Sequence, residues 1–130
     1  MARRPDNQIV GLCRFSYPAT AGFRLSAAGP EAVVETLYDP ARMQMRFALF
    51  ETVCLPSLAA QTDTAFRLVV LVGDMMPLRW RRRLRKLRED HPFLEICALP
   101  PRGPLQATRR AFRAASAVTP FVTGFRLDDD

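Results

Sequence analysis

Lysine is nearly absent from this sequence. Lys86 is the only lysine among 19 basic residues, so the formal net charge of +6 comes almost wholly from arginine. Guanidinium groups match phosphate oxygens well, so this bias suits a phosphate-bearing ligand. It can equally reflect the base composition of the genome, and charge alone therefore gives little weight to nucleic acid as a partner.

Cysteine is also scarce, and long apolar runs are missing. Cys13, Cys54 and Cys97 are odd in number, far apart and each inside an apolar segment, which excludes a disulfide framework and a zinc spacing and predicts buried thiols in a reducing compartment. Residues 1–8 are polar and lack a signal core, and no run approaches the roughly 20 apolar residues of a membrane span. We therefore expect a cytoplasmic protein.

Two common phosphate-binding motifs are missing as well. The chain contains neither G-x-G-x-x-G nor G-x-x-x-x-G-K-[ST]. These absences exclude the glycine-rich dinucleotide cradle and the P-loop. A phosphate ligand would have to be held in another way.

The apolar pattern predicts four strands, at residues 8–17, 65–74, 93–101 and 120–127. Helical patterns separate them, at about 40–61, 77–91 and 104–115, with a shorter helix at 30–37. Asp39 and Pro40 begin the first long helix and Pro56 must kink or restart it. The sheet-facing sides are predicted from Met43, Phe47, Phe50 and Cys54 and, in the last helix, from Leu105, Thr108 and Phe112. This alternation indicates one α/β domain over residues 1–130 with a parallel sheet.

The strand ends carry most of the candidate site residues. Right-handed crossovers bring the carboxyl ends of parallel strands to one edge of the sheet. In the common order 3-2-1-4 the first and fourth strands are neighbours at the switch point, where such sheets bind ligands. The ends are Arg14 to Tyr17, Gly73 with Asp74, Leu99 to Pro101, and Asp128 to Asp130.

The three terminal aspartates are the most unusual of these ends. Adjacent carboxylates repel one another unless a cation lies nearby. Asp128 and Asp130 point the same way if the strand continues, and they suit Mg²⁺ or Mn²⁺ bound together with a diphosphate. The alternative is an exposed acidic end without a function.

Two longer stretches resemble landmarks of family 2 glycosyltransferases. "LPSLAAQTDTAFRLVVLVGD" is similar to a helix followed by a strand that closes on an acidic residue, and "LQATRRAFRAASAVTPFVTGFRLDDD" is similar to a helix, a strand and the Asp-x-Asp metal motif. With "GLCRFSYP" and "FETVCLPSLAAQTD", the chain most resembles the bacterial rhamnosyltransferase group over residues 8–130. The resemblance implies the donor-binding half of a three-layer GT-A fold that stops after its fourth strand.

The resemblance also implies roles for individual residues. Around the nucleotide base it places Arg14, Phe15, Ser16 and Tyr17. Asp74 would contact the base or ribose, although the family usually has two acids there, and Arg109 would reach the nucleotide. Asp128, Asp129 and Asp130 would hold the metal and the donor. The plainer alternatives are a turn residue or helix cap for Asp74 and a solvated side chain for Arg109.

The implied reaction transfers a sugar, rhamnose in the closest group, from a dTDP- or UDP-linked donor to a glycan or lipid-linked acceptor, with Mn²⁺ or Mg²⁺ stabilising the leaving diphosphate. The general base and the acceptor-binding part are expected beyond residue 130. The arginine-rich helix at 79–88 is either a solvated face or a peripheral contact with anionic membrane. The competing hypothesis is a basic module that binds nucleic acid or another phosphate-bearing partner. It requires one continuous stripe formed by residues 79–88 and 109–113.

Overall fold

The computed structural model describes residues 7–18, 30–63, 65–115 and 121–127. Within these residues, four strands form one parallel sheet: β1 (Asn7–Arg14), β2 (Arg67–Gly73), β3 (Leu94–Leu99) and β4 (Phe121–Leu127). Their order is β3-β2-β1-β4, so the predicted α/β class and strand order are confirmed. β1 ends three residues earlier than predicted, because the chain turns at Ser16, whose φ is 52°.

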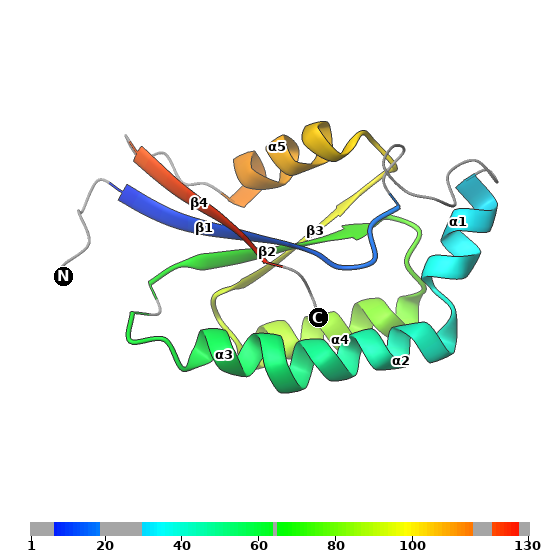
Figure 1. Ribbon diagram of the computed structural model, residues 1–130, viewed down its shortest axis with the longest axis horizontal. Helices are drawn as coiled ribbons and strands as arrows, with labels where there is room; N and C mark the ends of the chain where they lie inside the picture. The colour runs from blue at the N-terminus through cyan, green and yellow to red at the C-terminus, as the bar shows by residue number, and fades with distance from the viewer. Residues whose placement is uncertain (1–6, 19–29, 64, 116–120, 128–130) are drawn as a thin grey trace.

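Helices cover both faces of the sheet and give three layers (Figure 1). The helical segments are α1 (Pro30–Leu37), α2 (Pro40–Leu49), η2 (Phe50–Cys54), α3 (Leu55–Ala59), α4 (Leu78–Asp90) and α5 (Pro104–Ala115). The run from α2 to α3 lies beside α4 on one face, and α5 lies alone on the other (Figure 1). All four strands run in one direction, so their carboxyl ends meet at one edge.

Proline does not break the helical run from α2 to α3. In a regular α-helix the ring of Pro56 would clash with the carbonyl four residues earlier. Here η2 is a π-helical turn that ends with the Leu55 N–H donating to the carbonyl of Phe50, five residues back. Pro56 then falls in the first turn of α3, where its missing N–H costs little. The expected interruption therefore takes the form of a wider turn, and the helix continues.

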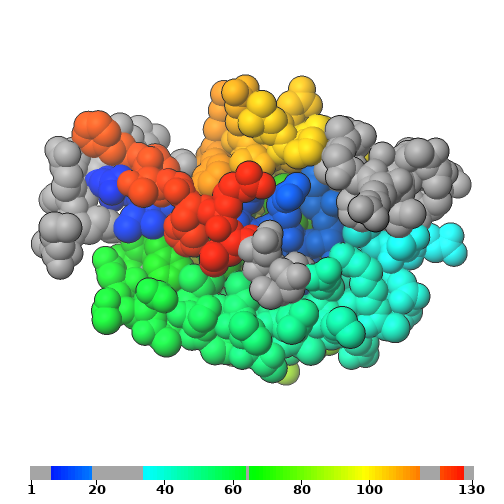
Figure 2. Space-filling view, in the orientation of Figure 1, coloured from blue at the N-terminus to red at the C-terminus, as the bar shows by residue number. Residues whose placement is uncertain are grey.

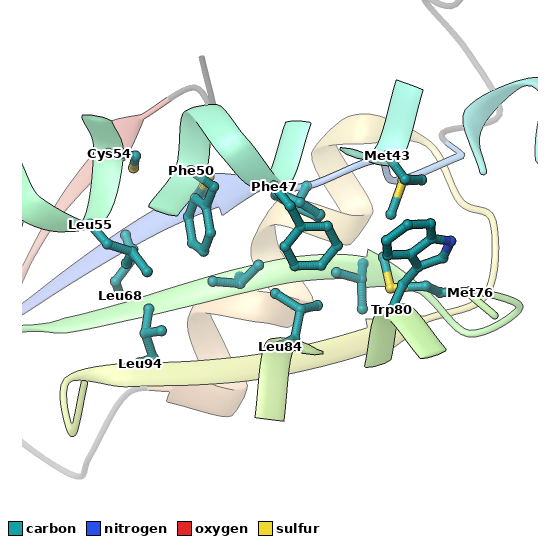
Figure 3. Close-up of a cluster of buried hydrophobic side chains, with 14 of the residues drawn as sticks. Met43, Phe47, Phe50, Cys54, Leu55, Leu68, Met76, Trp80, Leu84 and Leu94 are labelled. Atoms are coloured by element: carbon teal, nitrogen blue, oxygen red, sulfur yellow. The ribbon is translucent and has the colours of Figure 1, made fainter. Parts of the chain in front are cut away.

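The larger of two apolar clusters lies between the sheet and the helices α2, α3 and α4 (Figure 3). Four residues of the predicted helix face are buried in it, namely Met43, Phe47, Phe50 and Cys54. Trp80 and Leu84 meet them from α4. The smaller cluster joins alternate residues of β1 and β2 to Ala107 and Ala111 of α5. Alternation along the strands thus supplies both faces of the sheet.

The cysteine prediction holds in part. Cys13 and Cys54 are buried free thiols, whereas Cys97 on the edge strand β3 is only half-buried. Burial raises the pKa of the Cys97 thiol. It therefore stays protonated near neutral pH.

Candidate functional site at the carboxyl edge of the sheet

Arg14 and Phe15 end β1 with opposite environments. The Arg14 side chain is exposed at the edge. Phe15 has no exposed surface, and its ring packs against Phe47 at 4.8 Å and Phe50 at 5.2 Å between centroids. The Phe15 side chain therefore belongs to the core, and the implied contact of Phe15 with a nucleotide base stays a prediction that involves only its backbone.

Ser16 is held in a left-handed conformation that side chains other than glycine adopt rarely. Arg42 Nη1 donates to Ser16 Oγ at 2.7 Å and to the Leu37 carbonyl at 2.9 Å. Asp39 caps α2 by accepting from the Arg42 N–H at 3.1 Å. Arg42 thus ties the turn after β1 to the end of α1. Sequence reasoning missed this residue.

Tyr17 spans the sheet edge on the α5 side. Its buried hydroxyl donates to the Pro100 carbonyl at 2.7 Å, which joins the end of β1 to the end of β3. Burial raises the pKa of Tyr17, and the Asp74 carboxylate adds to this rise, while Arg102 opposes it. Tyr17 therefore keeps its proton and joins the ends of β1 and β3 close to Asp74 and Arg102.

Asp74 follows β2 in a turn and is partly exposed. Its N–H donates to the Leu99 carbonyl at 3.1 Å and so extends the pairing with β3. The N-cap of α4 is Pro77 and forms no side-chain capping bond, so Asp74 does not cap that helix. Its carboxylate contributes to a raised pKa in both Tyr17 and Tyr38, which belong to the clusters on opposite faces of the sheet. Asp74 therefore lies between the two tyrosines at the open edge.

Tyr38 is buried beside the end of β2. Its hydroxyl faces the Gly73 backbone, and a Cβ on Gly73 would collide with that hydroxyl and lie 2.8 Å from Pro18 Cδ. Burial raises the pKa of Tyr38 to about 12. Within the described part of the chain, three buried polar atoms lack a partner with good hydrogen-bond geometry: the Tyr38 hydroxyl, Trp80 Nε1 and Arg81 Nε.

Gly73→Ala is expected to lower the free energy of unfolding by about 1–3 kcal/mol, because overpacking forces neighbours to shift. Tyr38→Phe removes the colliding oxygen, so Gly73→Ala should cost less in that background, with the Pro18 contact left. Urea unfolding of the two single variants and the double variant measures the coupling. Additive effects would contradict the assigned collision.

Arg109 is exposed in the second turn of α5. Within the residues that the structure covers, no ion pair joins it to the groups around Asp74. A solvated side chain accounts for this placement, and the nucleotide contact stays a prediction.

Asp128, Asp129 and Asp130 lie outside the described residues. β4 ends at Leu127, which is paired with Cys13, the neighbour of Arg14 in the sequence. Figure 2 shows the red end of β4 against blue residues of β1. Among the residues described, no group of three or more His, Cys, Asp or Glu side chains could hold a metal ion. The metal site therefore stays a prediction for the aspartates.

The arginine-rich segments do not form one stripe. α4 and α5 lie on opposite faces of the sheet (Figure 1), so the continuous basic surface required by the nucleic-acid hypothesis is missing from the described part of the chain. Trp80 and Leu84 bury the apolar side of α4 in the core, so that side is not available to a lipid surface. In the ranges that the structure covers, no helix is both long and apolar enough to cross a membrane.

A parallel sheet in the order β3-β2-β1-β4 with helices on both faces defines an α/β domain, a class that typically binds ligands at the carboxyl edge, at its switch point. Residues 8–130 match the family described as "Putative rhamnosyl transferase", and the chain belongs to this family. Family membership supports a glycosyltransferase function in the broad sense and confirms the resemblance found in the sequence. No curated protein and no solved structure matches the chain.

Proposed function

We propose that this chain is the donor-binding part of a metal-dependent glycosyltransferase that uses a nucleoside diphosphate sugar. The observation that carries the proposal is the pairing of β4 with β1, in which Leu127 lies opposite Cys13. Asp128 follows Leu127 in the sequence, so the proposed metal motif begins directly after the strand end that pairs with β1. A donor diphosphate placed there would lie between the two strand ends.

Several residues at the carboxyl edge of the sheet would contact the nucleotide of the donor. Arg14 and the backbone of Phe15 and Ser16 would line the site for the nucleotide base. The hydrogen bonds of Arg42 to Ser16 and to the Leu37 carbonyl would fix the conformation of this turn. Tyr17 would hold the end of β1 in place without binding the base itself, because its hydroxyl already donates a hydrogen bond to the Pro100 carbonyl. Asp74, partly exposed between two tyrosines, would accept a hydrogen bond from the base or ribose.

The charged groups at the diphosphate would act on the departing negative charge. Asp128 and Asp130 would hold Mn²⁺ or Mg²⁺, with Asp129 toward the donor. The ion supplies Lewis-acid stabilisation of the leaving diphosphate when bound. Arg109 would add a fixed positive charge, provided that the ligand reaches the exposed side of α5.

The finer assignments follow the family name. We propose rhamnose as the sugar, dTDP or UDP as its carrier, and a glycan or lipid-linked acceptor. The location that fits such a reaction is the cytoplasm, with peripheral contact to an anionic membrane where the acceptor is lipid-linked. Because the apolar side of α4 is buried, such contact would depend on charge.

Asp130→Asn is expected to weaken donor binding at least about tenfold, because the metal loses one of its carboxylates. Binding of dTDP and UDP to the chain is measured calorimetrically with Mn²⁺ and again with chelator. Asp90→Asn, an exposed acid at the end of α4, removes the same charge elsewhere and serves as the control.

Two outcomes would count against the proposal. Nucleotide affinity that is unchanged by chelator and by Asp130→Asn would remove the metal site. Absent nucleotide binding, combined with binding to nucleic acid that falls steeply with salt, would favour the basic-module hypothesis.

A further inference from the structure

A cavity lies between the arginine-rich helix α4 and the edge strand β3. Its volume is about 200 Å³. Since a water molecule takes up about 30 Å³ in the liquid, a phosphate group and a few waters would fit. The lining consists of Val72, Arg81, Leu84, Arg85, Arg88, Ile96 and Ala98.

All polar side chains in this lining carry positive charge. Arg81, Arg85 and Arg88 follow one another at spacings of four and three, so their side chains share one flank of α4. The remaining lining residues are apolar. Arg81 is partly buried whereas Arg85 and Arg88 are exposed, so water competes least with an anion at the Arg81 guanidinium group.

The three arginines differ from their neighbour Arg83, which has an acidic partner. Arg83 Nε and Nη2 donate to the two carboxylate oxygens of Glu51 at 2.7 and 3.0 Å. Within the residues described, no ion pair joins Arg81, Arg85 or Arg88 to a carboxylate. Glu95, which neighbours the lining residue Ile96 in β3, is paired with Arg67 instead, at 2.9 Å.

Arg81 adds an independent sign of a missing partner. Its Nε is buried and has no hydrogen-bond partner with good geometry in the part of the chain that the structure covers. A buried donor of this kind is normally satisfied by protein, water or a ligand. An oxyanion in the cavity would satisfy it and would neutralise the cluster at the same time.

From this cluster we infer an anion site for a phosphomonoester group, held by Arg81, Arg85 and Arg88 over the apolar floor of Val72, Ile96 and Ala98. The phosphate is either free or the headgroup of a lipid. Planar guanidinium forks match the oxygens of such a dianion in pairs. None of the lining residues of this site belongs to the proposed donor site, although Arg81 is close enough to Tyr38 at the end of β2 to act on it electrostatically, and the proposal does not depend on the donor hypothesis. A nucleic acid is a poorer fit, because the cluster is compact and α5 lies on the opposite face.

The test uses the whole chain, inorganic phosphate as the probe, and NMR detection of the arginine Nε–H groups. We expect saturable shifts for Arg81, Arg85 and Arg88. The double variant Arg85→Gln/Arg88→Gln should bind phosphate at least about tenfold more weakly. Arg82→Gln/Lys86→Gln removes the same charge from the outer side of the same helix, as the matched control, and should bind like the parent chain. Thermal unfolding checks that both variants fold.

Vesicles distinguish the two sources of phosphate. Vesicles with phosphatidic acid, which carries a phosphomonoester, are compared with phosphatidylserine vesicles of equal surface charge. Binding that prefers phosphatidic acid and is lost in Arg85→Gln/Arg88→Gln supports a lipid headgroup. Binding of inorganic phosphate without this preference supports a free phosphate compound. Equal losses in the cavity variant and the matched control, or shifts that never saturate, would overturn the proposal.

Discussion

Phe47→Ala is expected to lower the free energy of unfolding by about 3–5 kcal/mol, as deletion of a buried aromatic ring typically does. The Phe47 ring has no exposed surface, and it lies 5.6 Å from Trp80 and 4.8 Å from Phe15, between ring centroids. The Arg83 guanidinium lies 4.5 Å above it. The deletion would therefore leave a cavity and loosen contacts from β1 and α4 at once. Urea unfolding monitored by circular dichroism measures the loss.

Phe121→Ala is the matched control for this experiment. Phe121 is the first residue of β4 and is about half exposed, so the same deletion should cost well under 1 kcal/mol. Similar losses in both variants would show that Phe47 does not occupy the centre of the core. Since Phe47 packs against Phe15, its deletion should also weaken the nucleotide binding that we propose at the turn after β1.

The sheet was predictable because its signals are local. Short apolar runs alternate with helical periods, and this alternation is compatible with few topologies of a parallel sheet. Val69 and Leu71 face one layer of helices while Leu68 and Val70 face the other, so β2 is apolar from Leu68 to Val72. A strand buried on both sides produces the strongest apolar run in the sequence.

The face of α5 was less predictable, because small residues carry little pattern. Leu105, expected on the sheet-facing side, is 63% exposed, and the fully buried residues of this helix are Ala107 and Ala111. Alanine allows the helix to approach the sheet closely, yet it contributes weakly to a hydrophobic period. The prediction was therefore wrong for Leu105, whereas Thr108 and Phe112 are partly buried and Phe112 packs against the cluster.

The candidate site shows the limit of sequence patterns more clearly. Arg42 is 26 positions from Ser16 in the chain, and its role depends on the left-handed turn at Ser16 and on the free carbonyl of Leu37. No spacing rule connects these residues. The burial of the Phe15 side chain was missed for a related reason: residues at a strand end alternate between core and edge, and the sequence does not mark where the strand stops.

Alkaline pH is expected to destabilise the protein through Tyr38. Its pKa is raised to about 12 by burial, whereas a tyrosine in the unfolded chain ionises near its ordinary value of 10.0. Below that value both states keep the proton. Between about pH 10 and about pH 12 the unfolded state ionises first, so the free energy of unfolding should fall by about 3 kcal/mol in total. Unfolding by urea from about pH 8 to about pH 12 measures the decline. Tyr38→Phe should lose this part of it and keep the smaller part due to Tyr17, whose pKa is also raised. The same decline in both chains would mean that the Tyr38 hydroxyl is accessible to water, and the packing of that hydroxyl against Gly73 would then be wrong.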